Sequence, residues 1–243
     1  MPRTRLDRLL VARGLAPTRE KAQALILAGR VEVEGRLVEK AGAPVADDAA
    51  LRVAAPPHPY VSRGGVKLEA ALDAFGVEVV DKTCLDVGAS TGGFTDCLLR
   101  RGAGRVYAVD VGYGQLDARL RADPRVVVRE RVNARNLSSE HVSEPVEVAA
   151  MDLSFISARL VLPAVAPLAA PGASILVLVK PQFEAGRGEV PRGGVVRSEE
   201  TRRRVLGEIE RFGEGMGLRH LGSIPSPIRG ARGNEEFLAA FRK

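Results

Sequence analysis

The chain has 243 residues and carries 36 Lys and Arg against 30 Asp and Glu, a formal net charge of +6. Its length allows one or two domains with a buried core. Hydrophobic residues (45%) and charged residues (27%) are in the usual range, which excludes a disordered chain, a collagen and a disulfide scaffold. Only Cys84 and Cys97 and three scattered histidines are present, so we expect no metal and a reduced, cytoplasmic protein.

No segment is expected to enter a membrane. Arginines at positions 3, 5, 8 and 13 leave no room for the apolar core of a signal peptide. Residues 160–179 form an uncharged stretch of 20 residues, which is long enough to span a bilayer. Because Pro163, Pro167, Pro171 and Gly172 interrupt it, we expect a buried helix followed by a buried strand.

Most of the net positive charge of the chain comes from the N-terminal 30 residues. Residues 1–30 hold seven basic and two acidic side chains, a net +5. This concentration indicates a polyanionic partner, although a solvated helix face is the plainer alternative. The same region predicts two short helices within 4–29, the first capped by Thr4 with Asp7 and the second by Thr18. A hairpin over 31–38 should follow.

The prolines at 56, 57 and 59 predict a semi-rigid linker. We therefore expect a small α+β domain over 1–55, a linker over 56–64 and a larger domain over 65–243. The larger domain should begin with a helix over 68–75 and continue with alternating strands and helices. Strands are expected over 83–87, 106–110, 126–129, 146–151 and 175–179 and near 218–224 and 236–241, with helices over 92–101, after 157 and over 199–213. This alternation predicts an α/β fold with a doubly wound, mostly parallel, Rossmann-like sheet.

A glycine-rich segment, Asp86–Phe94, follows the first of these strands and opens a helix. Its glycines would let the backbone approach a ligand, and Asp110, after the second strand, could accept hydrogen bonds from a ribose. The spacing matches neither the dinucleotide-binding fingerprint nor a P-loop. A nucleoside ligand without a pyrophosphate fits better, with S-adenosylmethionine as the candidate. A methyltransferase is weighed here against other α/β enzymes and against a turn that binds nothing.

Two charged residues follow later strands. Asp152 ends the fourth strand and Lys180 the fifth, so both are expected at the carboxyl edge beside the glycine-rich segment. Either residue alone would more commonly be a surface charge. Lys67 and the acids of Gly233–Phe237 have no distinguishing pattern of their own.

Four segments resemble the signatures of one family, in its order: Tyr60–Leu68, Asp86–Phe94, Met151–Ser157 and Lys180–Glu184. The chain resembles the TlyA family, known both as hemolysins and as ribosomal RNA 2′-O-methyltransferases, with an FtsJ-type catalytic domain. Residues 5–35 are similar to the small RNA-binding domain first named for a protein of the small ribosomal subunit. Thr18 departs from the usual serine, and Glu34 stands where asparagine is common.

The resemblance implies a Lys–Asp–Lys–Glu tetrad and S-adenosylmethionine as the cofactor. The tetrad would be Lys67, Asp152, Lys180 and Glu236, with Glu235 as the alternative to Glu236. Cofactor binding is expected at Asp86, Gly88, Ser90, Gly92, Gly93, Phe94, Asp110 and Asn133, of which Asn133 could equally be a turn residue. RNA binding is expected at Arg3, Arg5, Arg19, Lys21, Arg30 and Arg63.

The activity implied by the resemblance is methyl transfer to ribose 2′-hydroxyls of ribosomal RNA, at cytidines of 16S RNA, 23S RNA or both. The expected partners are ribosomal RNA and ribosomal subunits. Three alternatives are an RNA-binding assembly factor without turnover, a membrane-lytic hemolysin and a small-molecule methyltransferase. The intact tetrad argues against the first, the proline-interrupted apolar segment against the second and the basic N-terminal region against the third.

Overall fold

The structure is a computed structural model that describes residues 3–27, 29–38, 40–54, 58–186, 188–230 and 233–243. The chain divides into two compact units, Met1–Pro59 and Tyr60–Lys243, which are described separately. Pro56 and Pro57 of the expected linker lie outside the described residues.

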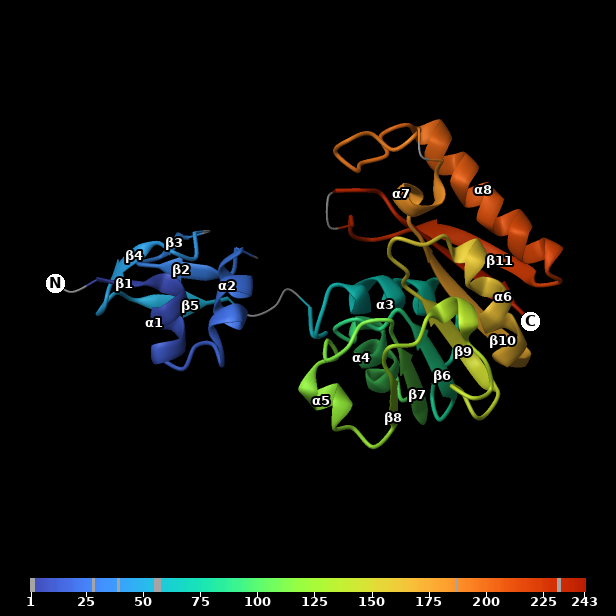
Figure 1. Cartoon of the computed structure of the whole chain (residues 1–243), viewed down its shortest axis with the longest axis horizontal. Helices are drawn as coiled ribbons and strands as arrows, with labels where there is room; N and C mark the ends of the chain where they lie inside the picture. The colour runs from blue at the N-terminus through green and yellow to red at the C-terminus, as the bar shows by residue number, and fades with distance from the viewer. Residues whose placement is uncertain (1–2, 28, 39, 55–57, 187, 231–232) are drawn as a thin grey trace. The chain divides into compact units, whose positions relative to one another are not determined.

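The smaller unit packs two helices against short antiparallel strands (Figure 1). Its elements are β1 (Arg3–Arg5), α1 (Leu6–Ala12), α2 (Arg19–Leu27), β2 (Val31–Val33), β3 (Arg36–Leu37), β4 (Pro44–Ala46) and β5 (Leu51–Val53). Strand β1 pairs with β4, and β2 lies between β3 and β5. The two helices and the hairpin are confirmed, whereas β1, β4 and β5, each only three residues long, were not predicted.

The predicted caps of the two helices have different outcomes. Thr18 is confirmed, because its hydroxyl accepts a hydrogen bond from the Lys21 backbone N–H at 3.3 Å. The prediction for Thr4 is wrong, since Thr4 pairs with Val45 in β1 and α1 begins after Arg5 with no side-chain cap. Because residues 3–5 pair with β4, they cannot form the first turn of α1.

Asp7 is the polar anchor of the smaller unit. Its buried carboxylate accepts hydrogen bonds from Arg5 (3.0 and 3.1 Å), Arg19 (2.9 Å) and Gln23 (2.9 Å). The hydrogen bonds from Arg5 are the largest cause that holds the pKa of Asp7 well below its usual range. One carboxylate thus fixes two of the arginines expected to bind RNA.

The larger unit is a seven-stranded sheet covered on both faces by helices (Figure 1). One hydrophobic cluster includes α3 (Gly64–Ala74), α4 (Gly93–Arg100) and α5 (Ala118–Arg121), and the other includes α6 (Leu162–Val165) and α8 (Glu199–Gly215). The strands are β6 (Thr83–Val87), β7 (Arg105–Val109), β8 (Val126–Arg129), β9 (Val146–Met151), β10 (Ala169–Val179), β11 (Arg219–Pro225) and β12 (Phe237–Arg242). Short elements are η1 (Ala134–Asn136), η2 (Ala158–Leu160), η3 (Ala166–Leu168) and α7 (Pro181–Glu184).

The strand order, β11-β12-β10-β9-β6-β7-β8, determines where a ligand can bind. From β6 the chain adds β7 and β8 on one side, then returns to place β9 on the other side of β6. Open α/β sheets bind ligands at such a reversal, outside the carboxyl ends of the strands. Strand β12 is antiparallel to both neighbours, so its first residues lie at that same edge. The mostly parallel, doubly wound sheet is confirmed.

The uncharged segment 160–179 is not one long helix. Pro163 lies in the first turn of α6 and Pro167 in the first turn of η3, and β10 begins at Ala169, six residues earlier than predicted. Among the residues that the structure describes, no helix is both long and apolar enough to cross a membrane.

Replacing Asp7 tests its role as the anchor. Asp7→Asn removes the charge that Arg5 and Arg19 contact, and we expect it to destabilise the smaller unit by about 2 kcal/mol, typical for hydrogen bonds to a charged group. Because the pKa of Asp7 is lower in the folded state, its contribution is present above about pH 4 and is lost as the pH falls. Urea unfolding from pH 3 to 7 should show this loss in the wild type and not in the variant. If the free energy of unfolding depended on pH equally in the wild type and in Asp7→Asn, the role of Asp7 as the anchor would be contradicted.

Candidate active site

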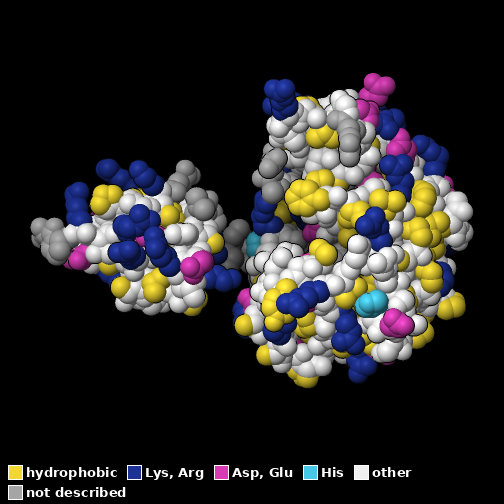
Figure 2. All heavy atoms as spheres, viewed as in Figure 1, with side chains coloured by type: hydrophobic (Ala, Val, Ile, Leu, Met, Phe, Trp, Pro, Cys, Tyr) yellow, Lys and Arg dark blue, Asp and Glu magenta, His cyan; other side chains and the backbone are white. Residues whose placement is uncertain are grey.

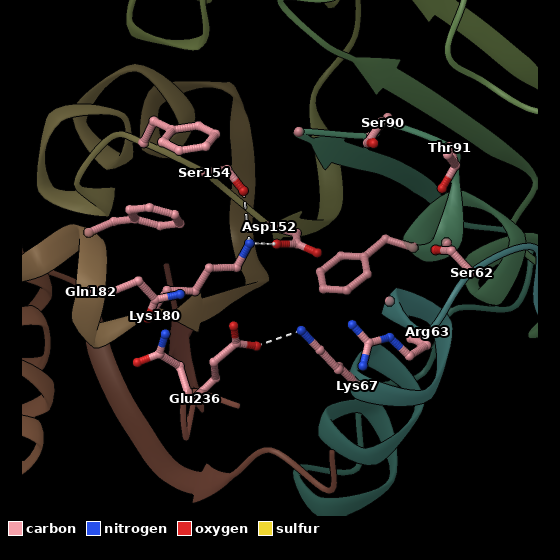
Figure 3. A pocket seen from close by; sticks show the side chains of 18 of the residues that line it. Ser62, Arg63, Lys67, Ser90, Thr91, Asp152, Ser154, Lys180, Gln182 and Glu236 are labelled. Atoms are coloured by element: carbon pink, nitrogen blue, oxygen red, sulfur yellow. Dashed lines mark hydrogen bonds and ion pairs between the residues drawn. The ribbon is translucent and has the colours of Figure 1, made fainter. Parts of the chain in front are cut away.

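A pocket of about 520 Å³ opens at the carboxyl edge of the sheet (Figure 3). Its wall contains all four residues that the family resemblance implies as a tetrad: Lys67, Asp152, Lys180 and Glu236. Lys67 lies in α3, Asp152 and Lys180 follow β9 and β10, and Glu236 immediately precedes β12. The sheet topology therefore gathers side chains that are up to 169 positions apart.

The four side chains form two ion pairs that face each other across the pocket (Figure 3). Lys67 Nζ lies 2.5 Å from Glu236 Oε2, and these side chains are only 9% and 2% exposed. Lys180 Nζ lies 2.5 Å from Asp152 Oδ1 and also donates to Ser154 Oγ at 3.2 Å. Each charge thus has an opposite charge beside it, which matters most for the buried Lys67 and Glu236 because buried ions require a partner, whereas Lys180 and Asp152 are partly exposed.

Glu235, the alternative to Glu236, points elsewhere. Its carboxylate pairs with Arg202 at 3.0 Å and with Arg229 at 3.1 Å, and it does not line the pocket. The structure therefore brings Glu236, and not Glu235, to Lys67.

The glycines after β6, which were expected to let the backbone approach a ligand, also pack closely against other segments of the protein. A Cβ atom at Gly88 would overlap the carbonyl oxygen of Asp152, and one at Gly93 would overlap the hydroxyl of Ser62. Gly92, at φ +96°, begins α4 with no room for a side chain beside Leu120. The loop holds together the segments that carry Asp152 and Lys67, while Gly88 and Gly93 also line the pocket.

Asp86 lies beneath this loop and lines neither pocket, contrary to the expectation that it binds a cofactor. Its fully buried carboxylate accepts hydrogen bonds from the backbone N–H (2.9 Å) and the hydroxyl (2.6 Å) of Thr95. Burial raises its pKa to about 7, more than the Thr95 hydrogen bonds lower it. The visible role of Asp86 is to hold the first turn of α4.

A second pocket of about 500 Å³ adjoins the first and shares Gly88, Ser90 and Asp152 with it. Asp110 lines it and accepts hydrogen bonds from the backbone N–H groups of Ser90 (2.8 Å) and Gly112 (2.6 Å). The rest of the wall is largely apolar, with Val109, Val111, Val132, Leu153 and Ile156.

Two further expected cofactor residues lie at these pockets. Asn133 lines the second pocket, but its side chain accepts a hydrogen bond from the Arg135 N–H at 3.1 Å and caps η1, so its role as a turn residue is confirmed. Phe94 lines the first pocket and is buried at the start of α4.

Several pocket residues were missed by sequence reasoning. Phe155 is 90% exposed, has φ +64°, lines both pockets and lies 5.0 Å, centroid to centroid, from the ring of Phe183. Gln182 lines the first pocket, and its buried Oε1 has no hydrogen-bond partner among the described residues. Phe155, Phe183 and Gln182 all lie inside segments that resemble the family signatures. Neither a charge nor a hydrophobic periodicity marked them as pocket residues.

The residues expected to bind RNA lie on both units and differ in their contacts with the rest of the protein. Arg3, Arg5, Arg19 and Lys21 are exposed on the smaller unit, where Figure 2 shows Lys and Arg side chains grouped near α1. Arg30 donates instead to the carbonyl of Ala54 at 2.7 and 3.1 Å. Arg63 lies at the first pocket beside Lys67, on the larger unit (Figure 3).

The fold and the pocket define a methyltransferase. Residues 60–243 match the FtsJ-like methyltransferase family, and residues 4–49 match the S4 domain. The chain belongs to the FtsJ-like methyltransferase family and, within it, groups with the TlyA proteins. It is 47% identical to the 16S/23S rRNA (cytidine-2′-O)-methyltransferase TlyA of Mycobacterium tuberculosis, over 99% of this chain and 90% of that relative.

Solved structures with the same fold include both a relative of similar sequence and a distant one. A candidate hemolysin from Streptococcus thermophilus is 42% identical with a TM-score of 0.79, covering 100% of this chain and 89% of that one. A candidate S-adenosylmethionine-dependent methyltransferase from Listeria monocytogenes shares only the fold, at 18% identity and a TM-score of 0.55 over 75% of this chain and 99% of that one. The predicted methyltransferase sheet with a small N-terminal RNA-binding domain is confirmed.

The raised pKa of Asp86 makes a prediction about stability. The Asp86 carboxyl should ionise near pH 4 in the unfolded state but near pH 7 in the folded state. The free energy of unfolding should therefore fall as the pH rises between these values. Asp86→Asn, which cannot ionise, should lack this decrease and gain stability relative to the wild type from pH 4.5 to 7 in urea unfolding. If the wild type instead became more stable relative to Asp86→Asn as the pH rises from 4.5 to 7, the raised pKa of Asp86 would be contradicted.

Proposed function

We propose that this chain transfers the methyl group of S-adenosylmethionine to a ribose 2′-hydroxyl of a cytidine in ribosomal RNA. The observation that carries the proposal is the pocket in which Lys67–Glu236 faces Lys180–Asp152, next to a second pocket of nucleoside size. The TlyA relative named above as a cytidine-2′-O-methyltransferase supports the choice of acceptor.

The second pocket fits the adenosine part of the cofactor. Its valines, with Leu153 and Ile156, offer apolar walls to a planar base, and Asp110 offers acceptor oxygens to ribose hydroxyls. Gly88 and Ser90, which line both pockets, would hold the methionine part. When bound, S-adenosylmethionine supplies a methyl group on a positively charged sulfur, open to displacement by an oxygen nucleophile.

Lys180 is the proposed group that acts on the proton of the 2′-hydroxyl: as an uncharged amine it would receive that proton, and as an ammonium it would steer the hydroxyl by a hydrogen bond. A ribose hydroxyl is a weak nucleophile until its proton is removed or strongly hydrogen-bonded. Asp152 and Ser154 fix the Lys180 Nζ at the wall of the pocket. Glu236 fixes Lys67 opposite, where the pair would orient the hydroxyl. Proton transfer by a positioned side chain contributes about 10²–10⁴-fold to a rate.

Substituting Lys180 tests this role and the proposed reaction together. Lys180→Ala should reduce transfer of labelled methyl from S-adenosylmethionine to ribosomal subunits by at least about 100-fold. Because Asp110 and the valines are untouched, cofactor binding measured by calorimetry should stay within a few-fold of wild type.

The matched control is Lys82→Ala, at the opposite, amino end of β6, which should behave as wild type in both assays. A loss of cofactor affinity large enough to account for the lost transfer would give Lys180 a structural role. Wild-type protein that labels no RNA would refute the proposed function.

RNA binding is proposed to use the smaller unit together with Arg63. The side chains of Arg5 and Arg19 are 45% and 46% exposed while Asp7 holds them in place, so they can still contact phosphates. Arg30 has fewer donors left because Ala54 uses two of them. With no Trp and 4% aromatic residues, phosphate contacts should dominate over base stacking.

The salt dependence of RNA binding measures these contacts. If about four phosphates are neutralised, the logarithm of the affinity should fall with the logarithm of salt concentration at a slope near −3. Arg19→Ala should make the slope less steep by about 1, whereas Arg125→Ala, paired with Asp123 on the larger unit, should leave it unchanged. A flat salt response in the wild type would contradict the phosphate contacts.

A further inference from the structure

Three groups of contacts join the two loops that carry Asp152 and Lys180. At the pocket, Lys180 meets Asp152 and Ser154 (Figure 3). Next along both loops, the ring of Phe183 packs against the ring of Phe155 at an interplanar angle of 48°. Farthest from the pocket, Glu184 at the end of α7 reaches the residues that begin η2.

Glu184 is a buried carboxylate that lines neither pocket and has no part in the proposed chemistry. It accepts hydrogen bonds from the hydroxyl of Ser157 at 2.5 Å and from the backbone N–H of Ala158 at 2.6 Å. Arg159 lies 3.8 Å from the same carboxylate. A buried acidic group is retained in a fold when its oxygens are satisfied in this way.

The loop between these contacts has an unfavourable backbone conformation. Phe155 has φ +64°, a left-handed conformation that an aromatic residue keeps only when the surrounding structure fixes the backbone. Before Phe155, the backbone N–H of Asp152 donates to Val87 at 2.9 Å. After Phe155, Glu184 holds Ser157 and Ala158. The far end of the loop therefore depends on Glu184.

We propose that Glu184 is a positioning residue for the Lys180–Asp152 pair. Its two hydrogen bonds fix the end of the loop 152–158, and the fixed loop holds Asp152 and Ser154 against Lys180. Residues 152, 154 and 155 of this loop line both pockets, so Glu184 acts on each of them without touching either. The inference rests on the proposed function, because it assigns the loop to that reaction.

The test compares Glu184→Ala with Glu184→Gln. Glutamine has the same shape, and its carbonyl can accept from Ala158 while its amide N–H donates to Ser157. At a temperature at which circular dichroism shows every variant folded, Glu184→Ala should lower kcat for methyl transfer by about 10–100-fold, since small displacements of reacting groups have effects of this size. Glu184→Gln should restore kcat to within about threefold of wild type.

The matched control is Glu189→Ala. Glu189 is an exposed glutamate five positions along the chain that likewise bonds a backbone N–H, that of Gly186, and an arginine, Arg204. Its substitution should leave kcat unchanged.

Two kinetic results with the Glu184 variants would overturn the proposal. If Glu184→Ala is less stable but keeps its kcat within about threefold of wild type, Glu184 only stabilises the fold. If Glu184→Gln is as slow as Glu184→Ala, restoring the hydrogen bonds does not restore the reaction. Should Glu184→Ala fail to fold, Ser157→Ala removes one of the two bonds, and an unchanged kcat would equally refute the role.

Amide hydrogen exchange of residues 152–160 separates this inference from the proposed function. Glu184→Ala should accelerate exchange of this segment at least about tenfold and Glu184→Gln should not, because only alanine frees the Ala158 N–H. Equal exchange in the wild type and Glu184→Ala would show that Glu184 does not hold the loop. A wild type that methylates no RNA would refute the proposed function, whatever the exchange result.

Discussion

The buried ion pair between Lys67 and Glu236 closes the site of the larger unit. It joins the first helix of that unit to its last strand, and neither charge could stay buried without the other. Glu236 is closely packed, since a Cβ atom at Gly230 would overlap its carboxylate. The glycine-rich loop also packs closely, with Gly93 against Ser62 just before α3. This pair therefore joins two distant segments of the chain at the wall of the pocket.

The second pair depends on the order of the strands. Asp152 and Lys180 meet because β9 and β10 are parallel neighbours whose carboxyl ends lie side by side. Gly88, on the other side of β9, leaves room for the backbone of Asp152. The Lys67–Glu236 pair thus joins α3 to the start of β12, and the Asp152–Lys180 pair joins the ends of β9 and β10, both at the wall of the same pocket.

Much of this site could be predicted because charged residues end apolar runs. Asp110, Asp152 and Lys180 each follow a buried strand, so their place at the carboxyl edge follows from the pattern. Lys67 and Glu236 needed the family resemblance, since one lies in a helix and the other precedes an antiparallel strand. The hydrogen bonds of Asp86, which lies inside β6, to Thr95 of α4 and those of Glu184 to Ser157 and Ala158 depend on tertiary packing, and no local pattern encodes that.

The identity of the methylated nucleoside is the decisive test of the proposed reaction at this pocket. Ribosomal subunits would be incubated with S-adenosylmethionine and either wild-type protein or Glu236→Gln, which leaves Lys67 without its charged partner, and the RNA digested for mass spectrometry. We expect 2′-O-methylcytidine with the wild type and little or none with the variant. Methyl groups on a base, or equal amounts of 2′-O-methylcytidine with both proteins, would contradict the proposed reaction.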